Sequence, residues 1–238
     1  MKTIGILGYG EIGQALDDIY LDHNYFPLIK DIDRDDGLGE VDILHVCIPW
    51  SPDFIDIVRQ YLEDIQPKMA VVHSTVAPGT TRELSKVCPN ICHSPVRGVH
   101  PNLMEGIQTF VKVFGGPSAG EAANHFNQDL EIECEVYNSA VATEVAKLLD
   151  TSYYGVCIAW HDYAKKLCDL WGVDFEEAQT HYNLTYNDGY RTLHKDNVVR
   201  PTLTPPEGSI GGHCVVPNAE LLEKILDSPL LQAITNLK

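Results

Sequence analysis

Cys214 lies in a short segment whose composition suits a nucleophile. Three glycines and a histidine accompany it in GSIGGHCVVPN, residues 208–218. A thiolate can add to an aldehyde, the adduct can pass a hydride to a nicotinamide, and hydrolysis of the resulting thioester releases an acid. Glycine neighbours let a substrate approach the sulfur closely. The segment therefore predicts a catalytic loop with Cys214 as nucleophile; a buried, inert thiol is the alternative.

Two further residue types could assist such a nucleophile. Lys147 ends the phrase ATEVAK, and Thr75 lies in HSTVAPGTT at the predicted end of a strand. An ammonium can stabilise oxyanion intermediates, and a threonine at that edge of a sheet can bond to substrate or to an ordered water. The alternatives are a solvated helix lysine and a strand-capping threonine.

Residues 8–13, GYGEIG, follow a strand-like run and open a helical pattern. In that context the first glycine permits a tight turn, the second lets the backbone approach a pyrophosphate, and the third allows close helix–strand packing. Asp31, at the end of the second strand, can accept hydrogen bonds from ribose hydroxyls and would repel a 2′-phosphate, so NAD is favoured over NADP. Asp33 is the rival for that role, and a glycine turn used only for packing is the alternative. The predicted cofactor set is Gly8, Tyr9, Gly10, Glu11, Ile12, Gly13, Asp31, Pro49 and Ser74.

Short apolar, β-branched runs alternate with helical patterns through the first half of the chain, which is typical of βαβ units. We expect a Rossmann-type, doubly wound parallel sheet over residues 1–138, with six or seven strands. The predicted strands are residues 3–7, 26–30, 43–48, 70–73, 91–93, 111–114 and 132–137, and helices are expected to begin near Glu11, Ser51, Thr80 and Ala119.

A smaller all-helical domain is expected over residues 139–238. Apolar residues recur at helical spacing from Ser139 to Trp171, and a helix of that length would extend about 50 Å. Because this exceeds the needs of a small domain, we interpret it as the spine of the second domain and as a homodimer interface, with a bent or broken helix as the alternative. A shorter helix is expected from Asp174, an ordered loop or mobile lid over 192–218 containing the catalytic segment 206–218, and a last helix over 220–226.

Composition narrows the partners and the compartment. The chain has 238 residues, 34 acidic against 17 basic, and a formal charge of −17, which repels nucleic acid and anionic membranes. We therefore expect a small-molecule substrate. No apolar run is long enough to span a membrane and no secretory signal is present at the start of the sequence. Seven scattered cysteines do not form a disulfide framework or a metal-ligand pattern, so we expect a cytoplasmic protein without a metal.

Taken in order, STV-x-PGTT, the helix lysine and GGHC resemble the UDP-glucose/GDP-mannose dehydrogenase family, with GGHC closer to its UDP-N-acetylmannosamine dehydrogenase branch. The resemblance extends over nearly the whole chain. It implies oxidation of a sugar primary alcohol to a carboxylate with two NAD and a covalent thioester, with Cys214, Lys147 and Thr75 as catalytic residues.

Three positions depart from the family pattern. The glutamate implicated in thioester hydrolysis is here Val96, the usual asparagine after the lysine is Thr151, and the usual aspartate after the cysteine is Asn218. The family also continues into a third domain that holds the nucleotide, and we expect this chain to be a truncated form lacking it.

Three interpretations of the function therefore remain open. The first is an NAD-dependent enzyme acting on a CH–OH group of a sugar-like or nucleotide-sugar substrate, stopping after one hydride transfer if Val96 cannot activate water. The second is a catalytically silent or partner-dependent NAD-binding module. The third is a β-hydroxyacid-type dehydrogenase, which uses the helix lysine and needs no cysteine. The candidate substrate contacts are Arg97, His100, Thr151, Tyr190, Arg200, His213 and Asn218.

Overall fold

The computed structural model describes residues 2–210 and 214–237. Its chain divides into two compact units, residues 1–147 and 148–238, with the boundary inside one long helix. Each unit is described by itself below.

The first unit is built on a seven-stranded sheet. Its strands are β1 (Ile4–Leu7), β2 (Leu28–Lys30), β3 (Ile43–Val46), β4 (Met69–Val72), β5 (Ile91–His93), β6 (Lys112–Gly115) and β7 (Cys134–Tyr137). They lie in the order β2-β1-β3-β4-β5-β6-β7, and the first five are parallel. The order reverses between β1 and β3, and such a switch point is where doubly wound sheets bind ligands. The Rossmann-type architecture expected from the sequence is confirmed.

The expectation of a parallel sheet is wrong at one junction, because β6 is antiparallel to β5. The single register pair joins His93 to Gly115, so β6 begins beyond the carboxyl end of β5. The connection between them contains one short helix, α4 (Leu103–Thr109), that the sequence analysis did not predict. Because this connection starts and ends at the same edge, it needs no crossover, which a parallel pair would require.

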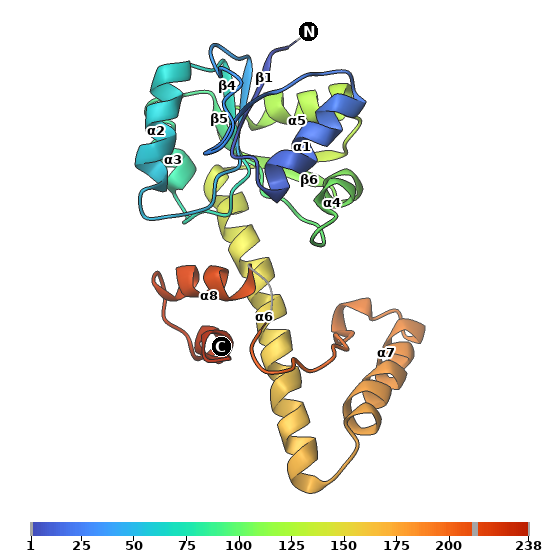
Figure 1. The fold of residues 1–238 in the computed structure, drawn as a ribbon. Helices are drawn as coiled ribbons and strands as arrows, with labels where there is room; N and C mark the ends of the chain where they lie inside the picture. The colour runs from blue at the N-terminus through green and yellow to red at the C-terminus, as the bar shows by residue number, and fades with distance from the viewer. Residues whose placement is uncertain (1, 211–213, 238) are drawn as a thin grey trace. The chain divides into compact units, whose positions relative to one another are not determined.

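Helices cover both faces of the sheet. Those of the first unit are α1 (Glu11–Asp22), α2 (Phe54–Ile65), α3 (Thr80–Leu84), α4 and α5 (Ala119–Asp129). Figure 1 shows α2 and α3 on one side of the strands and α1, α4 and α5 on the other. Alternate strand residues enter two separate cores, with Val71 packed on the α1 and α5 side and Val72 on the α2 side.

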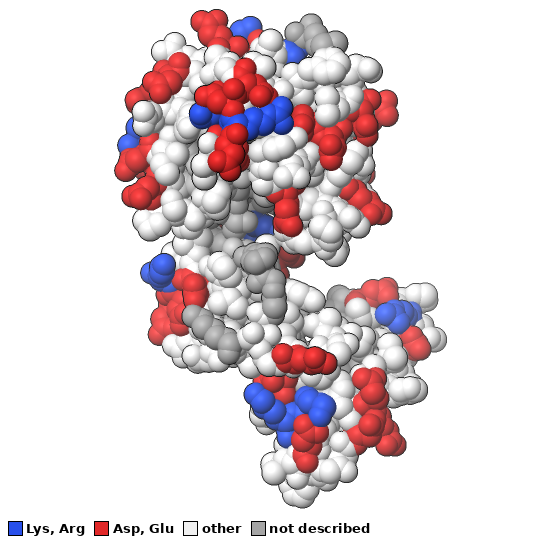
Figure 2. All heavy atoms as spheres, in the orientation of Figure 1, with Lys and Arg blue, Asp and Glu red and all other residues white. Residues whose placement is uncertain are grey.

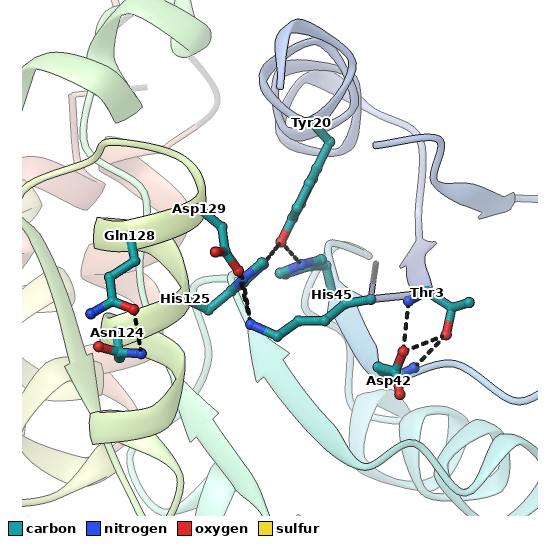
Figure 3. A network of polar contacts seen from close by, with 9 residues as sticks. Thr3, Tyr20, Asp42, His45, Asn124, His125, Gln128 and Asp129 are labelled. Atoms are coloured by element: carbon teal, nitrogen blue, oxygen red, sulfur yellow. Dashed lines mark hydrogen bonds and ion pairs between the residues drawn. The ribbon is translucent and has the colours of Figure 1, made fainter. Parts of the chain in front are cut away.

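A chain of polar side chains crosses the core between α1, α5 and the strands. The Tyr20 hydroxyl lies 2.8 Å from His125 Nε2 and 2.7 Å from His45 Nε2, as Figure 3 shows. His45 Nδ1 lies 2.9 Å from His73 Nε2, and His73 Nδ1 lies 2.9 Å from the carbonyl oxygen of Ser94.

The donor and acceptor roles in these hydrogen bonds are set by the Ser94 carbonyl oxygen, at the inner end of the series. A carbonyl oxygen only accepts, so neutral His73 donates from Nδ1 and accepts at Nε2. His45 must then donate to His73, Tyr20 to His45, and His125 to Tyr20. At the outer end, His125 Nδ1 then accepts from the Lys2 ammonium at 3.0 Å, and Lys2 also donates to Asp129 Oδ2 at 2.9 Å. The core is therefore held by one continuous, one-way set of hydrogen bonds.

The long helix α6 (Ala140–Trp171) is continuous, as the sequence predicted, and it belongs to both units. The other helical segments of the second unit are η1 (Glu176–His181, π-helical), α7 (Tyr182–Thr192), η2 (Asp196–Val198, 3-10), α8 (Val215–Glu223) and α9 (Pro229–Thr235). A Cβ at Gly155 would lie 2.7 Å from Val215 Cγ1 and 2.9 Å from Ile234 Cδ1. The glycine thus lets α8 and α9 pack closely against α6.

The predicted loop over 192–218 begins where α7 ends, at Thr192, and it contains η2. Its predicted end is wrong, because α8 begins at Val215 rather than at Glu220. Pro217 stands in the first turn of α8, where its missing N–H has no intrahelical partner to lose. Helix α9 was not predicted. None of the described helices combines the length and the apolar character needed to cross a membrane.

Candidate functional site

The glycine loop joins β1 to α1 at the switch point of the sheet. Gly8 has φ of 96°, and a Cβ there would lie 2.8 Å from the Cys47 carbonyl carbon. A Cβ at Gly13 would overlap the Gly8 carbonyl oxygen, whereas one at Gly10 would meet no described atom within 4 Å. Gly8 and Gly13 therefore close the turn, and Gly10 leaves open space before the N-terminus of α1, as a dinucleotide pyrophosphate requires.

Asp31 follows β2 and is held against this loop. Its carboxylate accepts hydrogen bonds from the backbone N–H of Tyr9 and, at 2.6 Å, from that of Ile32. Arg34 lies over the Tyr9 ring, 4.9 Å from its centroid, and forms an ion pair with Asp36 at 2.7 Å. Asp31 rather than the exposed Asp33 bonds to the glycine loop.

The remaining candidate cofactor residues lie around this loop. The Ser74 hydroxyl is buried and donates to the Ile48 carbonyl at 2.6 Å, which ties the end of β4 to the segment after β3. Pro49 is exposed in that segment, and Ile12 is partly buried against the core. Glu11, exposed at the start of α1, is hydrogen-bonded to His100.

Thr75 and Lys147 both belong to the first unit and are half-buried. Thr75 lies in the turn between β4 and α3, and Lys147 lies near the start of α6. The buried Glu144 carboxylate of α6 accepts hydrogen bonds from the backbone N–H groups of Gly79 at 2.6 Å and Thr81 at 2.8 Å. These bonds fix the start of α6 to the turn that carries Thr75.

Val96, which stands where the related family has a hydrolytic glutamate, is 6% exposed and belongs to the hydrophobic core. It offers no group that could activate water. Nearby, Arg97 donates to the Val111 carbonyl and lies over the Phe110 ring, 5.7 Å from its centroid. That arginine side chain therefore holds the loop before β6.

Cys214 belongs to the second unit, where it is half-buried and immediately precedes α8. Its carbonyl oxygen accepts from the Asn218 N–H at 3.1 Å. The Asn218 side chain is buried, and its Nδ2 has no hydrogen-bond partner among the described residues. Thr151 is half-buried on α6, and the prediction for His213 lies outside the described residues.

The thiols differ in burial, and this separates candidates from inert cysteines. Cys92 is fully enclosed, and loss of hydration raises the pKa of its thiol to about 12. Burial also raises the pKa of Cys47, and that of Cys134 to about 11. These three thiols stay protonated at neutral pH, so they are poor nucleophiles.

Tyr190 and Arg200 come together in the second unit. The Arg200 guanidinium lies 3.8 Å from the centroid of the Tyr186 ring, and the Tyr186 hydroxyl donates to Tyr190 at 3.0 Å. Asn187 bonds to both the N–H and the carbonyl of Arg200, each at 2.8 Å, and so fixes its backbone.

The sequence analysis missed three buried polar residues near the carboxyl end of the sheet: His93, Glu144 and Lys112. A detectable signal was the His-Ser pair that ends both neighbouring strands, His73-Ser74 and His93-Ser94. No three His, Cys, Asp or Glu side chains in the described ranges are grouped as a metal site would require.

Comparison with known proteins confirms the resemblance. No protein-family model matches the chain. The UDP-N-acetyl-D-mannosamine dehydrogenase of Methanococcus vannielii is 23% identical over 187 residues, which cover 76% of this chain and 39% of that protein. That of Methanococcus maripaludis (strain C7) is 23% identical over 190 residues, covering 77% and 40%. The chain thus spans about two fifths of the length of the curated relatives it matches.

Solved structures with a similar fold include two kinds of dehydrogenase. UDP-D-ManNAc dehydrogenase from Pyrococcus horikoshii has a TM-score of 0.77 and 16% identity, covering 99% of this chain and 68% of that one. The 3-hydroxyisobutyrate dehydrogenase of Mycobacterium tuberculosis has a TM-score of 0.71 and 16% identity, covering 99% and 92%. Both share the sheet and the helical region.

Proposed function

We propose that this protein is an NAD-dependent oxidoreductase that removes a hydride from a CH–OH group of a sugar-like or nucleotide-sugar substrate. The observation that carries the proposal is the open space at Gly10, before the N-terminus of α1 and beside the loop-bound carboxylate of Asp31. No described atom lies within 4 Å of a Cβ built at Gly10, so the loop leaves room for a pyrophosphate at the start of α1.

NAD would supply the hydride acceptor. On the protein side, backbone N–H groups of the glycine loop and the N-terminus of α1 would bind the pyrophosphate. Asp31 already accepts hydrogen bonds from the N–H groups of Tyr9 and Ile32, and its remaining lone pairs would accept from the ribose hydroxyls. Its negative charge would disfavour a 2′-phosphate.

Lys147 and Thr75 would act on the substrate. The ammonium of Lys147 would stabilise negative charge on the substrate oxygen, and the Thr75 hydroxyl would orient the substrate or a water. Cys214 would add to the aldehyde carbon in a second stage. Because Val96 is apolar and buried, we propose that one hydride transfer is the main reaction. Thr151, Tyr190, Arg200 and Asn218 are the proposed substrate contacts.

A β-hydroxyacid dehydrogenase is a second candidate. It is favoured by the fold shared with 3-hydroxyisobutyrate dehydrogenase, which extends over 92% of that chain. Such an enzyme would use Lys147 and would not need Cys214. A third candidate, an NAD-binding module without turnover of its own, predicts NADH binding and no reaction.

We also propose a homodimer formed through the long helix. Five large apolar side chains of α6, Trp160, Tyr163, Leu167, Leu170 and Trp171, are exposed, four of them by more than half. Four of these side chains line a depression of about 530 Å³ together with Val173 and Ala178; they are Trp160, Tyr163, Leu167 and Trp171. Figure 2 shows acidic side chains spread over the displayed face, which supports a small-molecule substrate rather than nucleic acid or membrane. Cys47, Cys88, Cys92, Cys134, Cys157 and Cys168 form no disulfide, which supports a cytoplasmic location.

The test has two steps. Titration with NADH and NADPH, followed by fluorescence, should show tighter binding of NADH; failure of both to bind would remove every dehydrogenase reading. A screen of UDP-sugars, GDP-sugars, free sugars and small hydroxy acids, followed by absorbance of the NADH formed, then separates the candidates. Turnover of hydroxy acids alone would favour the second candidate.

A further inference from the structure

His93 connects two elements that carry candidate catalytic residues. Its ring is fully buried at the end of β5. Nε2 lies 3.1 Å from the Ser74 carbonyl oxygen, and Nδ1 lies 2.8 Å from the Thr143 hydroxyl oxygen. Because the carbonyl only accepts, Nε2 donates to it, and the neutral ring accepts at Nδ1 from the Thr143 hydroxyl, whose oxygen also lies 2.9 Å from the Ala140 carbonyl oxygen.

The ring stays neutral in the folded protein. Burial lowers the pKa of His93 to about 3, with a contribution from the charges of Lys112 and Lys147 and against the opposing effect of the hydrogen bond to the Ser74 carbonyl. The neutral imidazole has one donor and one acceptor nitrogen, which match the Ser74 carbonyl and the Thr143 hydroxyl. At neutral pH both bonds of His93 therefore persist.

Each of these two hydrogen bonds ends on a residue that neighbours a candidate catalytic residue in the sequence or on the same helix face. Ser74 precedes Thr75, so its carbonyl belongs to the peptide bond that carries Thr75. Thr143 precedes Lys147 by four residues on α6, and residues at this spacing share a face of a helix. The His93 ring is thus bonded both to the turn of Thr75 and to the helix face of Lys147.

A comparison with His73 shows what is special about this arrangement. His73 donates to the Ser94 carbonyl at 2.9 Å, just as His93 donates to the Ser74 carbonyl, so the two histidines join β4 and β5 reciprocally. The other nitrogen of His73 bonds to His45 inside the core. Only His93, of this pair, bonds to α6.

We propose that His93 is a positioning residue that holds Thr75 and Lys147 in a fixed relation for the hydride-transfer step. The proposal rests on the proposed function, which makes Thr75 and Lys147 catalytic. His93 acts through Ser74 and Thr143 and does not itself contact substrate.

The first test compares steady-state kinetics of three variants with the wild type. His93→Phe removes both bonds, Thr143→Val removes only the bond to the helix, and His93→Gln keeps a donor and an acceptor. We expect kcat to fall roughly tenfold to a hundredfold in His93→Phe and Thr143→Val, because misplaced catalytic groups cost that much. NADH affinity should stay within about twofold, since the glycine loop is unchanged, and His93→Gln should recover most of kcat.

The matched control is His45→Phe. His45 is also a fully buried strand histidine with two side-chain hydrogen bonds, but its partners are Tyr20 and His73. It should lower stability while leaving kcat unchanged. If His93→Phe and Thr143→Val behave like His45→Phe, with kcat kept, the proposal is overturned.

A second readout does not depend on turnover. The rate at which an amine-directed reagent labels Lys147 is followed across pH by peptide mass spectrometry. We expect labelling roughly fivefold faster in His93→Phe and Thr143→Val than in the wild type and His45→Phe, because α6 loses a tether and opens locally more often. If the wild type oxidises no substrate, the proposed function fails, while this labelling still decides whether His93 positions Lys147. Equal labelling in all four proteins contradicts the proposal.

Discussion

The three glycines of the loop after β1 differ in what surrounds them. Gly8 is in the left-handed region and Gly13 touches the Gly8 carbonyl, so a side chain at either would disturb the turn itself. Gly10 faces open space. Packing of the described residues therefore does not require glycine at position 10, and we propose that a bound dinucleotide does.

Replacing Gly10 with alanine tests that interpretation. We expect Gly10→Ala to weaken NADH binding at least roughly tenfold, because the new methyl group occupies the space for the pyrophosphate. Stability should change by less than about 1 kcal/mol, as at a site without a steric clash. Thermal unfolding and NADH fluorescence titration measure the two effects.

Gly120→Ala in α5 is the matched control, since a Cβ there also meets no described atom within 4 Å. It should leave NADH binding unchanged. Equal NADH affinity in Gly10→Ala and Gly120→Ala would contradict a dinucleotide site at the loop.

Replacement of Cys214 separates the two enzyme classes. If the thiol is the second-stage nucleophile, Cys214→Ala abolishes acid formation from an aldehyde while the first hydride transfer continues. If the enzyme is of the β-hydroxyacid type, NADH formation on the true substrate is undiminished. Cys157→Ala, at another half-buried thiol of the second unit, controls for loss of a thiol as such.

At the scale of elements, the sheet carries buried histidines where strands usually carry aliphatic residues. His45 and His73 are fully enclosed, and burial lowers the pKa of both well below the ordinary value; the pKa of His93 is about 3. Each is neutral when folded. The unfolded chain, with ordinary histidine pKa values near 6.5, binds protons more readily.

The stability of the first unit should therefore depend on pH. The stabilisation that the neutral histidines provide is fully present above about pH 6.5, the pKa of histidine in the unfolded chain. It is lost as pH falls below that value, because protons then bind preferentially to the unfolded chain. We expect the free energy of unfolding to fall on the order of 6 kcal/mol between pH 7 and pH 5, about 2 kcal/mol for each of the three histidines. Urea denaturation at a series of pH values measures it. A flat profile over that range would show that these rings are not buried and neutral.

The elements themselves could be predicted where their patterns were long and regular. The β-branched runs predicted the strands, and the steady spacing of apolar residues predicted α6 as one helix. Helix α4 has only seven residues and contains Gly106, and α8 begins at a Cys-Val-Val-Pro sequence that favours a loop locally. Packing against Gly155 outweighs that local preference in α8.

The candidate site could be predicted only in part, because some of its residues follow a recognisable sequence spacing and others are identified only by their contacts. Glycine spacing depends on backbone geometry and is visible in one sequence. His93 contacts Ser74, 19 positions away, and Glu144 contacts Thr81, 63 positions away. A histidine inside a strand pattern gives no indication of such a partner. Those contacts follow only from the fold.

At the scale of the whole molecule, the exposed apolar side chains of α6 bear on assembly. Trp171 and Leu170 are 75% and 77% exposed. We expect Trp160→Glu combined with Trp171→Glu to convert a dimer to a monomer, because charge placed in an apolar interface must be desolvated. Sedimentation velocity measures the change. Ile225→Glu, at an exposed apolar residue outside α6, is the control, and a wild-type monomer at micromolar concentration would contradict the proposal.

The one-way hydrogen bonds from His125 to Ser94 also constrain how this core can change by mutation. Replacing one member leaves its neighbour with a donor or acceptor unmatched, whereas replacing several together with apolar residues can be nearly neutral. Tyr20, His45, His73 and His125 form a unit in this respect, although they are distant in sequence. In a lineage of such chains these four positions should be inherited, or lost, together.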